Sequence, residues 1–352
     1  MPRHGAQWRL GHRPALDGIR GLAVALVVVS HTVPLSHAVR WFGLFGVTVF
    51  FTLSGFLITA LLLEEHHEKS TIHFGAFYAR RARRLLPALL ATVLVVVAIG
   101  SVVDGFVHGA TVVGALTYLA NVLMLAGVAP TNDALGHTWS LAVEEQFYVL
   151  WPLLLLALLR LPRPAQRWLL LAAVAVTAVL PLQLVGGDTM HAYYGTDVHA
   201  MPLLLGASLG WFMHRRPYAD TSRPVLAAAA LAAMLVLGLG SSTFRLYLAP
   251  QVVAGLTAVM IWAAVRGPGV AWLEGRHLVR LGQLSYGLYL IHFPLIVLFD
   301  RWLDGPVLAV VALSLAWVLT LASWRYVELP ARRWRRVRPP AAPAPYVLGA
   351  RT

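Results

Sequence analysis

The stretch WFGLFGVTVFFTLSGFLITALLL, residues 41–63, contains no charged side chain. An α-helix needs about 20 apolar residues to cross the hydrocarbon core of a bilayer, because each residue adds about 1.5 Å. The composition of the whole 352-residue chain agrees, with 59% hydrophobic and 12% charged residues, against about 25% charged in soluble domains. The sequence therefore predicts an all-α, polytopic transmembrane helical bundle.

Apolar segments of spanning length recur along the chain. An additional apolar stretch, residues 111–129, is ambiguous because it can either cross or lie along a membrane face. The segments that we predict to cross are 19–36, 41–63, 85–103, 141–159, 168–186, 199–213, 224–240, 248–265, 281–299 and 306–324.

The distribution of lysine and arginine predicts the topology. Cytoplasmic segments of membrane proteins carry an excess of these residues. If both termini are cytoplasmic and 111–129 does not cross, only Arg40, Arg245 and Arg301 of the 28 Lys and Arg residues lie outside. If 111–129 did cross, the basic C-terminal tail would face out. We therefore predict about ten spans in the plasma (inner) membrane, with 111–129 re-entrant or interfacial.

The predicted organisation is a single membrane domain with short ends. Residues 1–18 form a cytoplasmic N-terminal segment, 19–328 the transmembrane domain, and 329–352 a basic, Pro/Ala-rich cytoplasmic tail. The basic, apolar start resembles a signal peptide, but further spans follow, and we interpret it as a retained helix.

Composition also excludes several kinds of site. The chain has no cysteine, so disulfides, thiolate catalysis and thiolate metal sites are excluded, and we predict no metal. The net charge of +13 comes from residues between apolar runs, which indicates membrane orientation and lipid contact, not nucleic-acid binding.

Two ionisable residues mark the first span, in DGIRGLAVALVVVSH at 17–31. Arg20 and His31 are eleven positions apart, so they lie on nearly one helical face, separated by about 16 Å. We expect Asp17 to cap the helix start and to pair with Arg20. Arg20 could anchor to lipid and His31 could bond a carbonyl, but ionisable groups inside a membrane are costly and usually functional.

A second cluster is HTWSLAVEEQFYVLWP, residues 137–152, at the predicted outer end of the fourth span. Ser140, Glu144 and Tyr148 are four residues apart and share a helical face. Trp139, Tyr148 and Trp151 could belong to an interfacial aromatic belt. A belt does not explain the adjacent carboxylates of Glu144 and Glu145, one of which we expect to face the interior.

Three further stretches could form part of a site. Ser54 interrupts the apolar run FFTLSGFLIT, 50–59, and either allows close helix packing or lines a cavity. The basic loop FYARRARRLLP, 77–87, either binds anionic lipid or holds a phosphorylated ligand; its arginines are Arg80, Arg81, Arg83 and Arg84. The stretch LGQLSYGLYLIHFPL, 281–295, gives the ninth span a polar face that suggests a cavity, formed by Ser285, Tyr286, Tyr289 and His292.

Together these segments resemble the acyltransferase-3 family of integral membrane O-acyltransferases. The family's Arg-x10-His pattern matches Arg20 and His31, and the resemblance extends from about residue 14 to 335. One position departs from the family pattern, because His199 stands where relatives commonly have an arginine at the start of the sixth span. The other matching motifs are LSGF at Leu53–Phe56, RRxRRxxP at Arg80–Pro87, WSLxxExxFY at Trp139–Tyr148, SYxxYLxHxP at Ser285–Pro294 and VExP with arginines at Val327–Arg333.

The resemblance implies an enzyme that moves an acyl group, such as acetyl, from acyl-CoA to a hydroxyl. Acyl-CoA would be a co-substrate, with no permanently bound cofactor, and the acceptor would be a glycan, a glycolipid or a macrolide-type molecule. His31 would be the general base, and Glu144 would orient it or bind the acceptor. The arginines expected to meet the CoA phosphates are Arg20, Arg80, Arg81, Arg83 and Arg84. The residues expected to line the substrate cavity are Asp17, Ser54, Trp139, Ser140, Tyr148, Ser285, Tyr286, Tyr289 and His292.

The alternative from another functional class is a proton-coupled transporter or flippase of a glycan or lipid precursor. Such a protein would use the buried histidine and glutamate as a proton relay. It would usually show two related halves, and the sequence shows none.

Overall fold

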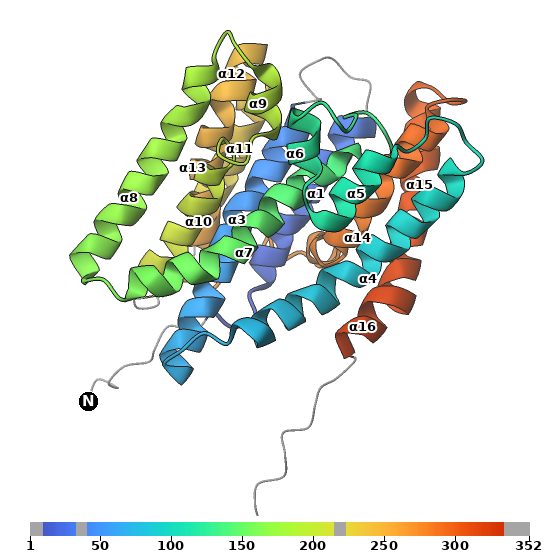
Figure 1. Ribbon diagram of the computed structural model, residues 1–352. Helices are drawn as coiled ribbons and strands as arrows, with labels where there is room; N and C mark the ends of the chain where they lie inside the picture. Colours follow the sequence, from blue (N-terminus) through green and yellow to red (C-terminus); the bar gives the residue numbers. More distant parts are fainter. Residues whose placement is uncertain (1–9, 33–40, 215–222, 334–352) are drawn as a thin grey trace, which may run out of the picture.

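The computed structural model describes residues 10–32, 41–214 and 223–333, which form one bundle of helices without a strand (Figure 1). The predicted all-α membrane class is confirmed. Eight helices of this part are long and apolar enough to cross a membrane. They are α1 (Pro14–Thr32), α3 (Phe42–Lys69), α4 (Phe74–Gly100), α7 (Trp139–Leu159) with the preceding turn, α8 (Arg163–Val179) with the following turn, α13 (Ala249–Arg266), α14 (Arg276–Phe299) and α15 (Gly305–Ser323) with its extension to Arg333.

Two shorter apolar helices, α10 (Ala200–Met213) and α11 (Pro224–Leu237), have 14 residues each. Together with the eight long helices they overlap in sequence with the ten predicted segments. The basic stretch 77–87, which we predicted as a loop, is instead helical, because α4 begins at Phe74. At about 1.5 Å per residue, 14 residues extend about 21 Å, which is less than the roughly 30 Å of a hydrocarbon core. The number of crossings therefore stays a prediction.

The ambiguous stretch 111–129 is not one helix. It contains most of α5 (Gly109–Thr117) and all of α6 (Ala120–Leu125), separated by Tyr118, whose φ of 56° is left-handed. Neither helix is long enough to cross a bilayer. This geometry fits the prediction that 111–129 is re-entrant or interfacial and does not cross. Two other short helices, α9 (Thr189–Tyr194) and α12 (Ser242–Tyr247), lie at the same end of the bundle (Figure 1).

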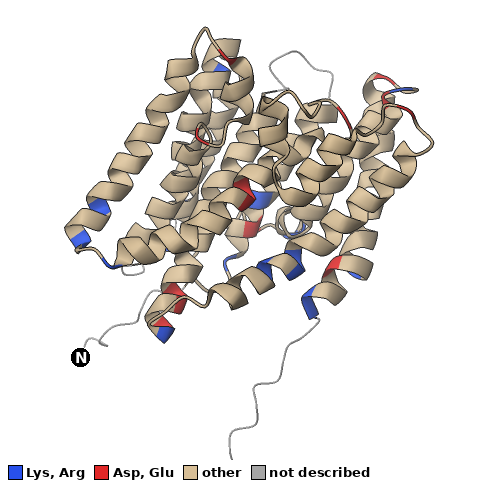
Figure 2. Ribbon diagram, in the orientation of Figure 1, with Lys and Arg blue, Asp and Glu red and all other residues tan. Residues whose placement is uncertain are grey.

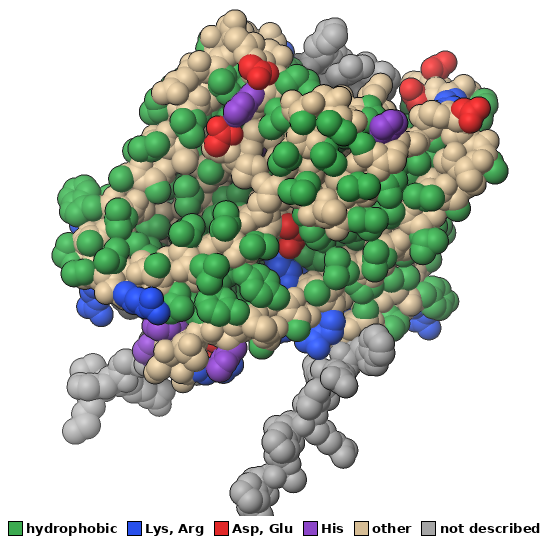
Figure 3. Space-filling model, viewed as in Figure 1, with side chains coloured by type: hydrophobic (Ala, Val, Ile, Leu, Met, Phe, Trp, Pro, Cys, Tyr) green, Lys and Arg blue, Asp and Glu red, His purple; other side chains and the backbone are tan. Residues whose placement is uncertain are grey.

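The two sides of the bundle differ in charge. The start of α1 and the end of α16 (Leu329–Arg333) lie on the lower side in Figure 1, and most of the basic segments lie there too (Figure 2). We call this the basic side, and the end with α5, α6, α9 and α12 the opposite side. Between the two sides the visible surface is mostly apolar (Figure 3), as a lipid-facing surface requires. The assignment of the basic side to the cytoplasm stays a prediction.

The predicted C-terminal tail begins in a helix. Residues Trp324–Glu328 form one π-helical turn after α15, and α16 follows directly. The remaining tail, 334–352, lies outside the described residues, as do 1–9 of the N-terminal segment and 33–36 of the first predicted span.

The centre of the bundle is α1, which packs against α3 and α14, while α3 packs against α10. A Cβ atom added to Gly282 would lie 1.8 Å from the Asp17 carbonyl oxygen, so the backbones of α14 and α1 touch. Small residues allow such close approach in membrane bundles. The polar residues of α1, α3 and α14 are therefore held at fixed positions relative to one another.

Candidate active site

Three cavities follow α1 from the basic side to the opposite side. The vestibule has a volume of about 560 Å³, the inner cavity about 300 Å³ and the outer cavity about 80 Å³. Asp17, Arg20 and Arg84 line both the vestibule and the inner cavity. Val47 and Tyr289 line both the inner and the outer cavity. The cavities thus form a series through the bundle. Arg20 lines the first two of them, and His31 lines the last.

The vestibule is strongly basic. Guanidinium groups bind phosphate oxygens through paired N–H donors, so several arginines around one cavity suit a phosphorylated ligand. The arginines come from α1, α4 and α16, and they are Arg20, Arg80, Arg83, Arg84 and Arg332.

Arg332 was not among the predicted site residues, although it belongs to the VExP motif that the sequence analysis identified. It forms an ion pair of 3.0 Å with Glu328, which is 1% exposed. The i, i+4 spacing of the two residues at the end of the VExP motif was the available signal. Arg80 also has an acidic partner, Glu65 at 3.1 Å, but this pair is at the exposed edge of the vestibule.

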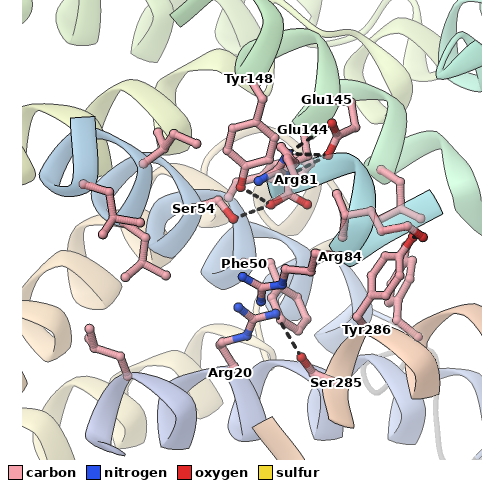
Figure 4. A pocket seen from close by; sticks show the side chains of 18 of the residues that line it. Arg20, Phe50, Ser54, Arg81, Arg84, Glu144, Glu145, Tyr148, Ser285 and Tyr286 are labelled. Carbon is pink, nitrogen blue, oxygen red and sulfur yellow. Dashed lines mark hydrogen bonds and ion pairs between the residues drawn. The ribbon is translucent and has the colours of Figure 1, made fainter. Parts of the chain in front are cut away.

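Arg20 and Arg84 lie where the vestibule meets the inner cavity. Arg20 Nη2 donates a hydrogen bond of 3.3 Å to Ser285 Oγ. Figure 4 shows the Arg84 guanidinium beside that of Arg20. Two like charges in a partly buried position repel one another, and an anion between them would relieve this.

Asp17 lines these two cavities but does not cap α1. The helix begins at Pro14, so Asp17 lies in its first turn, and the capping prediction is wrong. Its Oδ2 lies 3.8 Å from Nε2 of His12, on the segment that precedes the helix, and the two form an ion pair when His12 is protonated.

Arg81 faces the inner cavity, away from the vestibule. Its guanidinium makes two-point contact with Glu145, with Nη2 2.6 Å and Nε 2.9 Å from Oε1, and it stacks on the Tyr148 ring (Figure 4). A charge neutralised in this way is less available to a phosphate. Of the five arginines predicted to bind the phosphates, Arg81 is therefore the one that does not line the vestibule.

Glu144 also faces the inner cavity (Figure 4). Its carboxylate accepts hydrogen bonds from Ser54 Oγ and from Tyr148 Oη, the latter at 2.5 Å. Both adjacent glutamates are thus inside the bundle, where one was expected. The expected contact between Glu144 and His31 is not formed, because His31 lines the outer cavity and is paired with another residue.

That residue is His292 on α14. His31 Nδ1 lies 3.1 Å from His292 Nε2, and His292 Nδ1 lies 2.9 Å from the Leu288 carbonyl oxygen. A carbonyl can only accept, so His292 Nδ1 carries the proton and its Nε2 is the acceptor. His31 must then donate from Nδ1. In two neutral rings this leaves the lone pair of His31 on Nε2, the nitrogen that a general base uses.

The outer cavity is lined mainly by aromatic side chains. His31, His137, Trp139, Tyr289 and Phe293 meet there with two tyrosines of α9, Tyr193 and Tyr194. His137 is 4% exposed, and its ring centroid lies 5.2 Å from that of Tyr289 and 5.8 Å from that of His292.

Trp139 therefore lines a cavity instead of forming an interfacial belt. It is 5% exposed and packs against His199, with ring centroids 5.1 Å apart. His199 is held by the Tyr193 carbonyl oxygen, 2.8 Å from its Nε2, so the residue that departs from the family pattern supports the wall of the outer cavity.

The predicted cavity residues divide between two cavities. Those that line the inner cavity are Asp17, Ser54, Ser140, Tyr148, Ser285, Tyr286 and Tyr289. Trp139 lines the outer cavity, and His292 lies fully buried behind His31. His137 stood in a noted motif but was not assigned to the site, and Tyr193 and Tyr194 gave no sequence signal. Within the described ranges no group of three or more His, Asp or Glu residues could hold a metal ion.

Comparison with known proteins identifies relatives over nearly the whole chain. The model of the acyltransferase domain, acyltransferase-3, matches residues 13–325. YrhL of Bacillus subtilis is 32% identical over 353 residues, which cover 91% of this chain and 55% of YrhL. No solved structure matches.

Two other relatives carry functional names. The O-acetyltransferase OatA of Staphylococcus aureus is 28% identical over 351 residues, covering 91% of this chain and 57% of OatA. The peptidoglycan O-acetyltransferase OatA of Listeria monocytogenes is 30% identical over 357 residues, covering 91% of this chain and 56% of its own length. The chain thus spans about half the length of the curated relatives that it matches.

Proposed function

The chain belongs to the acyltransferase-3 family, and we propose that it transfers an acetyl group from acetyl-CoA to a hydroxyl of a cell-wall glycan. The names of two relatives support O-acetyl transfer, and one of them supports peptidoglycan as the acceptor. The observation that carries the proposal is the series of cavities along α1, which joins a cluster of arginines on one side to His31 near the other.

The vestibule is the proposed site for the phosphate groups of CoA. Arg83, Arg84 and Arg332 line it together with Arg20, and guanidinium groups bind phosphates through charge-assisted hydrogen bonds. Arg20 would hold the phosphate end nearest to the inner cavity, while its bond to Ser285 fixes its direction.

The inner cavity would then hold the thioester arm. Arg81 and Glu145 neutralise one another at its wall, and Glu144 is held by Ser54 and Tyr148. Four arginines and three carboxylates line this cavity, so its charges nearly balance. This suits an arm that carries amides and no charge. Glu144 thus has the role of shaping the donor cavity instead of orienting the base.

The reaction would take place at His31. Its Nε2 takes the proton of the acceptor hydroxyl while the hydroxyl oxygen attacks the thioester carbonyl carbon. The new C–O bond forms, the C–S bond breaks, and the proton passes from His31 to the departing CoA sulfur. The ring can take this proton without losing its bond to His292, because Nδ1 is the donor in that bond before and after.

The proposal is tested with the full chain purified in detergent, acetyl-CoA and soluble peptidoglycan strands. We expect release of the CoA thiol that depends on the strands, and base-labile acetate on the recovered strands. Release of neither product, with acetyl-CoA still bound, would instead favour a transporter.

A further inference from the structure

The inner and outer cavities meet at two side chains. Val47 on α3 and Tyr289 on α14 line both cavities, and no other residue in the described part of the chain does so. The outer cavity, about 80 Å³, has about a quarter of the 300 Å³ of the inner cavity. A group that moves from the arginines towards His31 must therefore pass Val47 and Tyr289 and fit into the smaller space.

Tyr289 cannot move aside without losing two buried hydrogen bonds. Its hydroxyl donates to the His137 carbonyl oxygen at 2.8 Å, which uses its one proton. It therefore accepts from Ser140 Oγ, at 2.5 Å. The side chain is 6% exposed, and leaving such groups unpaired in a buried position is costly, because no water replaces the lost partners.

Val47 is fixed through its backbone. A Cβ atom added to the preceding residue, Gly46, would lie 2.5 Å from the Ala23 carbonyl oxygen, so α3 is already in contact with α1 at this level. Val47 is 6% exposed, and its branched side chain has one strongly preferred rotamer in a helix. The opening between the cavities is thus bounded by a rigid phenol on one side and a rigid isopropyl group on the other.

We propose that Val47 and Tyr289 determine the length of the acyl group that the protein transfers. The inference rests on the proposed function, in which the donor enters from the arginines with its acyl group leading. When the thioester carbonyl reaches His31, the sulfur and the arm behind it occupy this opening, and the rest of the acyl chain lies ahead in the outer cavity, whose wall includes Val47 and Tyr289. The acetyl methyl group fits there, whereas a butyryl chain meets Val47, Tyr289 and the aromatic wall.

The size of Val47 gives two opposite tests. Val47→Ala enlarges the outer cavity, which Val47 also lines, and should raise the butyryl-to-acetyl ratio of kcat/KM by roughly tenfold or more, since one methylene in an apolar pocket changes kcat/KM by about 10–200-fold. Val47→Ile adds one methylene and should lower the propionyl-to-acetyl ratio. The isoleucine variant keeps the position apolar and filled, so it gives a result even if the alanine variant folds poorly.

Val49→Ala is the matched control. Val49 lies on the same helix and is 3% exposed, but it lines neither cavity. The experiment measures esters on soluble peptidoglycan strands, and CoA release, with acetyl-, propionyl- and butyryl-CoA. We expect the wild type and Val49→Ala to share one strong preference for acetyl and Val47→Ala to lose it.

The outcomes separate the two proposals. Equal acyl preferences in Val47→Ala, Val47→Ile and Val49→Ala would overturn the inference, while acetyl transfer by the wild type would leave the proposed function standing. Equal use of acetyl- and butyryl-CoA by the wild type would also overturn it. If the wild type transfers no acyl group of any length, the proposed function fails first.

Discussion

The two ends of the cavity series present opposite chemistry. The vestibule is lined by five arginines and one aspartate, on the basic side of the bundle. The outer cavity is lined by aromatic rings, two histidines and small residues, and none of its described lining residues is Asp, Glu, Lys or Arg. One end therefore suits charged groups, and the other depends on hydrogen bonds and shape.

This difference predicts a gradient of sensitivity along α1. Several arginines share the binding of phosphates, and solvent screens those at the exposed edge, so the loss of one of these should cost little. In the buried outer cavity each polar group has one role and no substitute. We expect the effect of a substitution to rise from the vestibule to His31, and four predictions test this order.

His31 should give the largest effect. His31→Gln keeps a side-chain N–H that can donate to His292 but removes the base, so turnover should fall roughly 10²–10⁴-fold, the usual range for such a group. The assay is acceptor-dependent CoA release, normalised to the amount of folded protein. His73→Gln, at an exposed histidine outside the three cavities, is the control and should keep full activity. Near-normal turnover in His31→Gln would remove the general-base mechanism.

The sequence predicted the helical fold, and it also predicted the relative positions of the two site residues that lie on one helix. Mainly apolar runs of spanning length must be helical in lipid, so the ten segments could be read directly. Within one helix the spacing of residues fixes their geometry. For that reason the placement of Arg20 and His31, about 16 Å apart along one helix, followed from their numbers alone.

Contacts between helices could not be read in the same way. His31 and His292 are 261 residues apart, and nothing in the sequence says that α1 and α14 are neighbours with these two rings in register. The choice of Glu144 as the partner of His31 rested on the family motif and not on geometry. The helix start was also misplaced, because Pro14 precedes the apolar run that marked the span.

His292 should give the next largest effect. His292→Ala removes the acceptor that selects the tautomer of His31, and turnover should fall about 10–100-fold, as it does when other orienting partners are removed. His292→Gln offers a side-chain carbonyl oxygen that can accept from His31 Nδ1, so it should recover part of the loss. KM for acetyl-CoA should not change in either variant. Equal losses in both variants would indicate packing, not orientation, as the role of His292.

Arg20 should show an intermediate effect, on donor binding. Arg20→Ala should raise KM for acetyl-CoA roughly tenfold, which corresponds to the lower end of the 1.5–3 kcal/mol of a charge-assisted hydrogen bond. The KM of Arg20→Lys should lie between those of the wild type and Arg20→Ala, because lysine keeps the charge and loses the two-point geometry. Arg160→Ala, at an exposed arginine that lines none of the three cavities, serves as the control. An unchanged KM in both Arg20 variants would instead favour the interpretation of Arg20 as a lipid anchor.

Arg80 should give the smallest effect, although it belongs to the same basic motif as Arg84. Its guanidinium is exposed and already paired with Glu65 at 3.1 Å. Exposed ion pairs contribute about 0.2–1 kcal/mol, so Arg80→Ala should raise KM for acetyl-CoA by less than about fivefold.

The salt dependence of KM distinguishes the contribution of the exposed Arg80 to donor binding from that of the more buried Arg20. At 0.5 M NaCl the Arg80→Ala and wild-type KM values should converge, because exposed charges are screened beyond a few ångströms, while the difference caused by Arg20→Ala should persist. If Arg80→Ala instead raised KM as much as Arg20→Ala and did so in high salt, the exposed edge of the vestibule would bind the donor as firmly as its interior. The proposed gradient along α1 would then be wrong at the end where the donor enters.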